Sequence, residues 1–156
     1  MTSSHPCVEK IRHENVTVKQ RGRRANFVNP ERAFYNRIQV DGCLVSEGKK
    51  ADWIVSKINI GSVIVELKGK HLDEAYEQLL ATIENKVCSC WLEERRSFLI
   101  ICSRVPSFDT IVARKELEAR KRGVRLKIIC GHRDIKIESL LGLPENKGRK
   151  EKSKKK

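Results

Sequence analysis

The chain has 156 residues, of which 39% are hydrophobic and 34% charged, so it can build one modest core but not two domains. The formal net charge of +13 favours a polyanionic partner, and nucleic acid is the leading candidate. No apolar run reaches the length of a membrane span and no secretory signal pattern is present. We therefore expect a cytoplasmic protein with no membrane partner and with its six cysteines reduced.

Residues 1–30 are polar and basic, and their densest basic cluster is Arg21-Gly22-Arg23-Arg24. We expect a basic N-terminal arm or a loosely packed segment here. Whether this cluster, with Arg23 and Arg24, contacts phosphate groups or only faces water is left open. Residues 30–35 are the candidate for a first helix, with Asn29 as its cap and Pro30 at its first position.

The segments that follow predict one core domain over residues 31–143. Predicted strands cover residues 37–41 (continued by 43–45 after Gly42), 51–55, 62–69, 97–102 and 124–130, and predicted helices cover residues 71–86 and 110–122. The order strand, strand, strand, helix, strand, helix, strand predicts a mixed α/β fold. Residues 144–156 are rich in lysine and are predicted to be a disordered basic tail.

The cysteines are expected mainly in the core, because Cys43 and Cys102 lie in apolar, strand-like runs. A zinc site built on Cys88 and Cys90 is disfavoured, since the Cys-x-Cys spacing is tighter than that of the usual structural pairs.

Two acids mark the ends of a predicted β-hairpin. Asp52 opens the strand over residues 51–55 and Glu66 lies near the end of the next strand, after a turn in which Gly61 is free to adopt positive φ. In an antiparallel hairpin the start of one strand lies beside the end of the other, so the two carboxylates should meet at one sheet edge. Lys68 shares a face with Glu66, whereas Leu67 points away.

Two carboxylates and one lysine at a sheet edge indicate a site for a hard divalent cation, Mg²⁺ or Mn²⁺. The competing interpretation is that Asp52 and Lys68 only cap exposed strand ends and pair with each other.

An Asp, a short spacer and Glu-x-Lys at the end of an apolar strand, followed by a helix, resemble the PD-(D/E)xK nuclease superfamily. The resemblance covers about residues 36–130. This part of the chain is also similar to a group of small single-domain members of the superfamily. It implies a restriction-endonuclease-like mixed sheet flanked by helices. It also implies Asp52, Glu66 and the carbonyl of Leu67 as metal ligands and Lys68 as the catalytic lysine.

Two further residues acquire a role only through this resemblance. Glu47 falls where some relatives place an additional acid, and Gln78 matches a helix glutamine found in several branches. Gln78 either points toward the site or lies at the rim of its helix. The chain departs from the pattern at Ala51, where the motif name has proline, and it lacks a tyrosine after Gln78 at the spacing of some exonuclease branches.

The leading interpretation is a Mg²⁺-dependent DNA endonuclease, with DNA favoured over RNA and a homodimer left open. The residues expected to contact nucleic acid are Arg23, Arg24, Lys49, Lys50, Lys70 and His71. His71 has the competing interpretation of capping the helix that follows it. The alternatives are a non-catalytic nucleic-acid-binding module on the same fold and a defence or toxin nuclease directed by a partner.

Overall fold

The computed structural model describes residues 5–67, 71–102, 109–131 and 133–144, and within them the chain forms a mixed α/β fold. The strands are β1 (Val8–Ile11), β2 (Asn15–Gln20), β3 (Arg23–Val28), β4 (Tyr35–Gln39), β5 (Trp53–Lys57), β6 (Gly61–Leu67), β7 (Arg96–Cys102), β8 (Arg125–Cys130) and β9 (Asp134–Ile135). The helices are α1 (Leu72–Glu84), α2 (Lys86–Ser89), α3 (Asp109–Lys121) and α4 (Ile137–Leu140). None of the described helices is long and apolar enough to cross a membrane.

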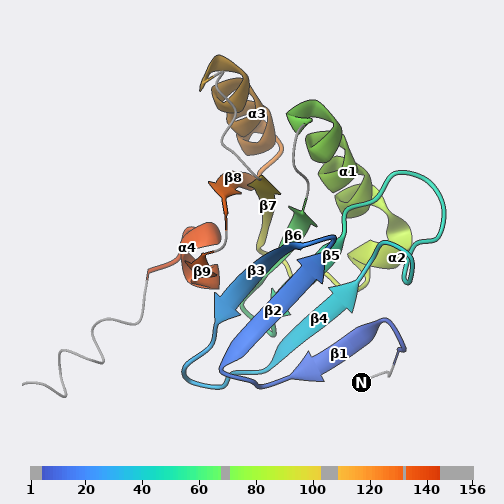
Figure 1. Ribbon diagram of the computed structural model, residues 1–156, viewed down its shortest axis with the longest axis vertical. Coiled ribbons are helices and arrows are strands. Elements are labelled where there is room, and N and C mark those ends of the chain that lie inside the picture. The colour runs from blue at the N-terminus through green and yellow to red at the C-terminus, as the bar shows by residue number, and fades with distance from the viewer. Residues whose placement is uncertain (1–4, 68–70, 103–108, 132, 145–156) are drawn as a thin grey trace, which may run out of the picture.

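Two sheets organise the fold (Figure 1). The larger has six strands in the order β1-β4-β5-β6-β7-β8, and its first four strands pair antiparallel. The pairs β6–β7 and β7–β8 are parallel, and α1 and α3 lie in the connections between their strands. The smaller sheet consists of the antiparallel pair β2–β3 with β9 added in parallel.

Both faces of the large sheet are covered. Alternate residues of its strands, among them Ile54 and Ile64, pack with α1 in one core cluster. The residues between them, such as Val55 and Val65, pack with β2, β3 and α4 in a second cluster. Because both faces are covered, all seven residues of β6 are buried, as expected for a central strand.

The hairpin of β5 and β6 confirms the prediction of two strands joined by a short turn. The positive φ in this turn is at Asn59 (φ 69) and not at Gly61, so that detail of the prediction is wrong. Gly61 instead allows a close approach, because a Cβ atom there would lie 2.4 Å from Cδ1 of Leu141. The later predicted elements are confirmed as α1, β7, α3 and β8.

Residues 8–28 fold as three strands, in place of the arm or loosely packed segment expected from the sequence. The side chains of Val16, Val18 and Phe27 are fully buried and pack on the large sheet. They alternate with mostly polar residues along β2 and β3, and this period of two places the buried apolar side chains on one face.

The predicted helix over residues 30–35 is wrong, since this segment is a turn followed by extended chain. Asn29 does not cap a helix. Its buried side-chain amide donates to the carbonyls of His13 and Ala33, and its oxygen accepts from the Ala33 amide. These three hydrogen bonds satisfy backbone groups of the loop. In a helix, such groups would instead bond to other backbone groups of the helix.

Cys43 was expected in the core, in a strand and as a free thiol, and the structure shows none of these. It is exposed in a turn after β4 and does not continue the strand, because the amides of Cys43 and Val45 both donate to the carbonyl of Val40. It forms a disulfide with Cys7, at a Cα–Cα distance of 5.7 Å. The pairing of β1 with β4 brings Cys7 to this turn, since the Gln39 amide donates to the Cys7 carbonyl. Cys102 is buried as expected.

Candidate active-site cleft

The β5–β6 hairpin brings Asp52 and Glu66 together. Trp53 pairs with Val65, so the next position along each strand places Asp52 opposite Glu66, and the Asp52 amide donates to the Val65 carbonyl at 3.1 Å. By strand alternation both carboxylates lie on the face that α1 covers, the face of Ile54 and Ile64. Asp52 is 7% exposed and Glu66 2%, which makes this a buried acid pair.

The Asp52 carboxylate has a fixed orientation. The backbone amide of Leu67 donates to its Oδ2 atom at 2.8 Å, a charge-assisted bond from the neighbouring strand. On the other side, the amides of Val40 and Asp41 donate to the Asp52 carbonyl at 3.0 and 3.4 Å. Leu67 also lines the cleft into which the Asp52 carboxylate opens.

These acids open into a cleft of about 230 Å³, which we call the acid cleft. Its lining residues are Gln20, Arg21, Asp41, Gly48, Lys50, Asp52, Glu66, Leu67 and Gln78. They come from the tip of the β2–β3 hairpin, the loop before β5, the facing ends of β5 and β6, and α1. The acid cleft therefore joins both sheets and one helix.

Arg21 reaches the acid cleft from a strained turn. Arg21 and Gly22 have φ angles of 50° and 82°, the conformation of a two-residue hairpin turn that normally favours Asn-Gly. An arginine in the left-handed region costs about 1 kcal/mol or more. The turn places a guanidinium-bearing residue in the wall of a cleft that contains Asp41, Asp52 and Glu66.

The hydroxyl group of Thr82 links α1 to the residue that precedes Asp52. The Ala51 amide donates to Oγ1 of Thr82 at 2.6 Å, and this hydroxyl donates to the Gln78 carbonyl at 2.8 Å. Thr82 is buried, and Gln78 is half-buried in the cleft wall. Of the two orientations expected for Gln78, the structure has the one that lines the site.

The other predicted residues divide into three groups. Lys68 and Lys70 lie outside the described residues. Lys50 lines the acid cleft, where its ammonium group donates to the Gly48 carbonyl and lies 3.9 Å from the Asp41 carboxylate. Glu47, Lys49 and His71 are exposed and are not among the lining residues.

Two of these exposed residues have other environments. Lys49 pairs with Glu77 of α1 at 2.5 Å. His71 occupies the cap position of α1, but its side chain makes no capping hydrogen bond.

Arg23 and Arg24 lie on β3, away from the lining of the acid cleft. Arg24 lines a separate groove with Arg133, and Arg23 is half-buried. Burial and the neighbouring Cys130 raise the pKa of Cys102, and the charge of Arg23 opposes this rise. The sequence thus identifies the basic cluster of residues 21–24, but the member of this cluster that lines the acid cleft is Arg21.

Sequence reasoning missed Gln20, Arg21 and Asp41. The signal for the first two is the apolar alternation on both sides of Arg21-Gly22, which predicts a hairpin with this pair at its tip. Asp41 has no comparable local signal. It reaches the cleft because its amide binds the Asp52 carbonyl and because the following turn folds back on Val40.

The donor set fits a hard cation with few protein ligands. Among the described residues there is no group of three or more His, Cys, Asp or Glu side chains placed to hold a metal ion. Mg²⁺, however, is commonly held by one or two carboxylates, with waters and substrate phosphate filling the other positions. Asp52, Glu66 and the Leu67 carbonyl supply oxygen donors of this kind.

Comparison with protein-family models, with curated proteins and with solved structures finds no match for this chain. The function is therefore inferred from the chemistry of the acid cleft.

Proposed function

We propose that the protein is a metal-dependent nuclease of the PD-(D/E)xK type that hydrolyses phosphodiester bonds, with DNA as its substrate. One observation carries the proposal: two buried carboxylates, Asp52 and Glu66, meet in a cleft whose wall also contains Arg21 and Lys50. Burying two acids side by side costs free energy, and such arrangements concentrate at functional sites. A divalent cation would compensate both charges.

The acids of the cleft would bind the metal ion in this reaction. Asp52, Glu66 and the Leu67 carbonyl would hold Mg²⁺ or Mn²⁺, which when bound lowers the pKa of a coordinated water and neutralises charge on the phosphate. Water attacks phosphorus and the bond to the 3′ oxygen breaks, which leaves a 5′-phosphate and a 3′-hydroxyl. The Leu67 amide keeps Asp52 oriented throughout.

The polar residues around the acids serve the substrate. Arg21 and Lys50 carry positive charge to the cleft wall, where they can hold the phosphates beside the scissile bond. The Gln78 amide can hydrogen-bond the attacking water or a phosphate oxygen. We assign Lys68 the role of orienting the attacking water, because it follows Glu66 by two positions in the sequence.

The topology supports a restriction-endonuclease-like core. Three antiparallel strands (β4, β5 and β6) precede α1, and β7 then pairs parallel with β6. The acids lie where β5 begins and β6 ends, the position that the resemblance implies.

A nucleic-acid-binding module without catalysis is the alternative, and the net charge of +13 is equally compatible with it. The acid pair favours catalysis. A protein that only docks on phosphates gains nothing from two buried carboxylates in the same cleft, because they repel the phosphates that Arg21 and Lys50 attract.

Incubation with supercoiled plasmid, linear duplex, branched DNA and RNA, in Mg²⁺, Mn²⁺ or EDTA, tests the proposal. We expect metal-dependent cutting by the wild type, lost in Glu66→Gln and in Lys68→Ala. Glu77→Gln is the matched control, since Glu77 is an exposed acid of α1 that pairs with Lys49. Cutting by Glu66→Gln at the wild-type rate, or binding without cutting in every metal, would overturn the proposal.

A further inference from the structure

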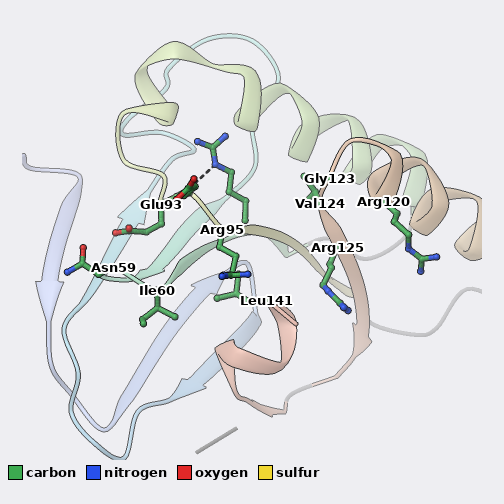
Figure 2. Close-up of a pocket in the computed structure, with 11 residues that line it drawn as sticks. Asn59, Ile60, Glu93, Arg95, Arg120, Gly123, Val124, Arg125 and Leu141 are labelled. Atoms are coloured by element: carbon green, nitrogen blue, oxygen red, sulfur yellow. Dashed lines mark hydrogen bonds between the residues drawn. The ribbon is translucent and has the colours of Figure 1, made fainter. Parts of the chain in front are cut away.

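A second and larger cleft, of about 840 Å³, lies at the other end of the large sheet (Figure 2). Four arginines line it, and we call it the arginine cleft: Arg95, Arg96, Arg120 and Arg125. Arg96 and Arg125 are the first residues of β7 and β8, whereas Glu66 lies near the end of the parallel strand β6. The two clefts therefore occupy opposite ends of the parallel strands.

The positive charge of the arginine cleft is only partly compensated within it. Arg95, Arg120 and Arg125 are exposed, and none of them makes an ion pair with a residue that the structure describes. Glu93 and Glu94 also line the cleft, so four arginines and two glutamates leave a net charge of +2. A concave surface with uncompensated guanidinium groups is suited to an anion.

Close packing holds this cleft in shape. A Cβ atom on Gly142 would lie 2.5 Å from Nε and 2.8 Å from Cζ of Arg125, so this guanidinium rests directly on the Gly142 backbone. Leu141 packs in the same way on Gly61. Figure 2 shows Arg95 near Leu141, with Arg125 and Arg120 further along the same opening. An arginine held in place, as Arg125 is, loses less conformational entropy when it binds a ligand.

Phosphate is the anion that these groups recognise best, because the planar guanidinium donates two parallel hydrogen bonds to its oxygens. We propose that the arginine cleft is a second binding site for the sugar–phosphate backbone, remote from the bond that is cut. The identity of the polyanion rests on the proposed function.

The distance between the clefts sets the length of nucleic acid required. The seven residues of β6 span roughly 20 Å, which corresponds to about six nucleotides of one strand. Since the backbone has to pass around the sheet, a ligand that occupies both clefts is longer than this. The arginine cleft thus favours long substrates and adds affinity without touching the reacting phosphate.

Binding in EDTA tests the arginine cleft independently of cleavage. A triple variant, Arg95→Ala with Arg120→Ala and Arg125→Ala, is compared with the wild type on a labelled duplex of about 30 base pairs over a range of salt concentrations. We expect the magnitude of the slope of log Kobs against log salt to fall by about 2 to 3, and affinity to fall by roughly tenfold or more.

The matched control removes three exposed cations from outside the clefts, through Arg12→Ala, Arg32→Ala and Lys86→Ala. It should keep the wild-type slope, and an equal fall in both triple variants would overturn the proposal. The thermal unfolding midpoint of each variant checks the fold, and the corresponding Arg→Gln triple repeats the test with larger side chains.

Two further outcomes separate the alternatives. An unchanged slope, together with tripolyphosphate binding that the arginine triple abolishes, would assign the cleft to a small phosphate compound and overturn the backbone site. A reduced slope in a protein that cuts nothing in any metal would support the backbone site and refute the proposed nuclease.

Discussion

Asp52→Asn should make the metal-free protein more stable while it abolishes cleavage. The substitution removes one of two facing carboxylates but keeps a side-chain oxygen that can accept from the Leu67 amide. The new amide group can also donate to Glu66. Two facing carboxylates repel each other when no cation lies between them, and this variant removes that repulsion.

The magnitude follows from the geometry. Directly opposed side chains on neighbouring strands lie roughly 5 Å apart, and two charges at that distance repel by about 3 kcal/mol at an effective dielectric constant near 20. Exchanging a charge-assisted hydrogen bond for a neutral one costs about 1 kcal/mol. The net gain is about 1 to 2 kcal/mol, which raises the unfolding midpoint by about 2–8 °C in a domain of this size.

Thermal unfolding in EDTA and in Mg²⁺ measures both effects. When Mg²⁺ is in tenfold excess over its Kd, the wild type should gain about 1.4 kcal/mol, whereas Asp52→Asn should gain little. Asp134→Asn is the control, because this acid accepts from Asn26 on the small sheet and is not among the residues of the acid cleft. Two results together would refute this reasoning: an Asp52→Asn variant less stable than the wild type, and a wild-type unfolding midpoint that Mg²⁺ does not change. They would show that Asp52 has a structural role.

Two further predictions concern stability. Lys57→Met leaves Glu31 and Glu138 without the ammonium group that lies 2.5 Å from each, and should cost about 2–4 kcal/mol in urea unfolding, against little for the exposed Lys86→Met. Burial lowers the pKa of Lys57, but the hydrogen bonds that its ammonium group donates to Glu138 and Glu31 outweigh this effect and raise the pKa overall. The stabilisation should therefore persist below about pH 10.4 and fade above it, and parallel wild-type and Lys57→Met curves through that range would contradict this. Gly61→Ala should cost about 1–3 kcal/mol, because its Cβ atom would lie 2.4 Å from Leu141 Cδ1 and 3.1 Å from the Arg95 carbonyl oxygen. Gly48→Ala, at φ +84° in open space, should show only backbone strain, and equal stability of Gly61→Ala and wild type would refute the packing argument.

The hairpin and its acid pair were predictable because their geometry is local. Asp52 and Glu66 are 14 positions apart, and antiparallel pairing alone brings them to one edge. The N-terminal strands were missed because the charge of residues 1–30 obscured a short apolar alternation. Val16 and Val18 face Ala25 and Phe27 in a pattern of period two, which predicts a hairpin once the arginines and lysines between them are disregarded.

Contacts between distant segments account for the rest of the site. Arg21 reaches the acid cleft only because the small sheet packs on the large one, and no local pattern indicates that packing. The disulfide between Cys7 and Cys43 has the same origin, since the edge pairing of β1 with β4 spans an intervening hairpin. Such partners are set by tertiary packing, which sequence periodicity does not encode.

The direction of the parallel strands separates the two clefts. β6 ends at the acid cleft, and the first turn of α1 then brings Asp73 and Glu74 to that end of the sheet. Like α1, α3 returns from that end of the sheet to the other, and it ends with Arg120 and Lys121 just before β8 begins. Acidic residues at helix starts and basic residues at helix ends are favoured by the helix dipole. This accounts for Arg120 alone among the four arginines, because the last turn of α1 has no basic residue. The other three come from the starts of β7 and β8 or the residue just before, and parallel pairing brings these positions to one edge of the sheet.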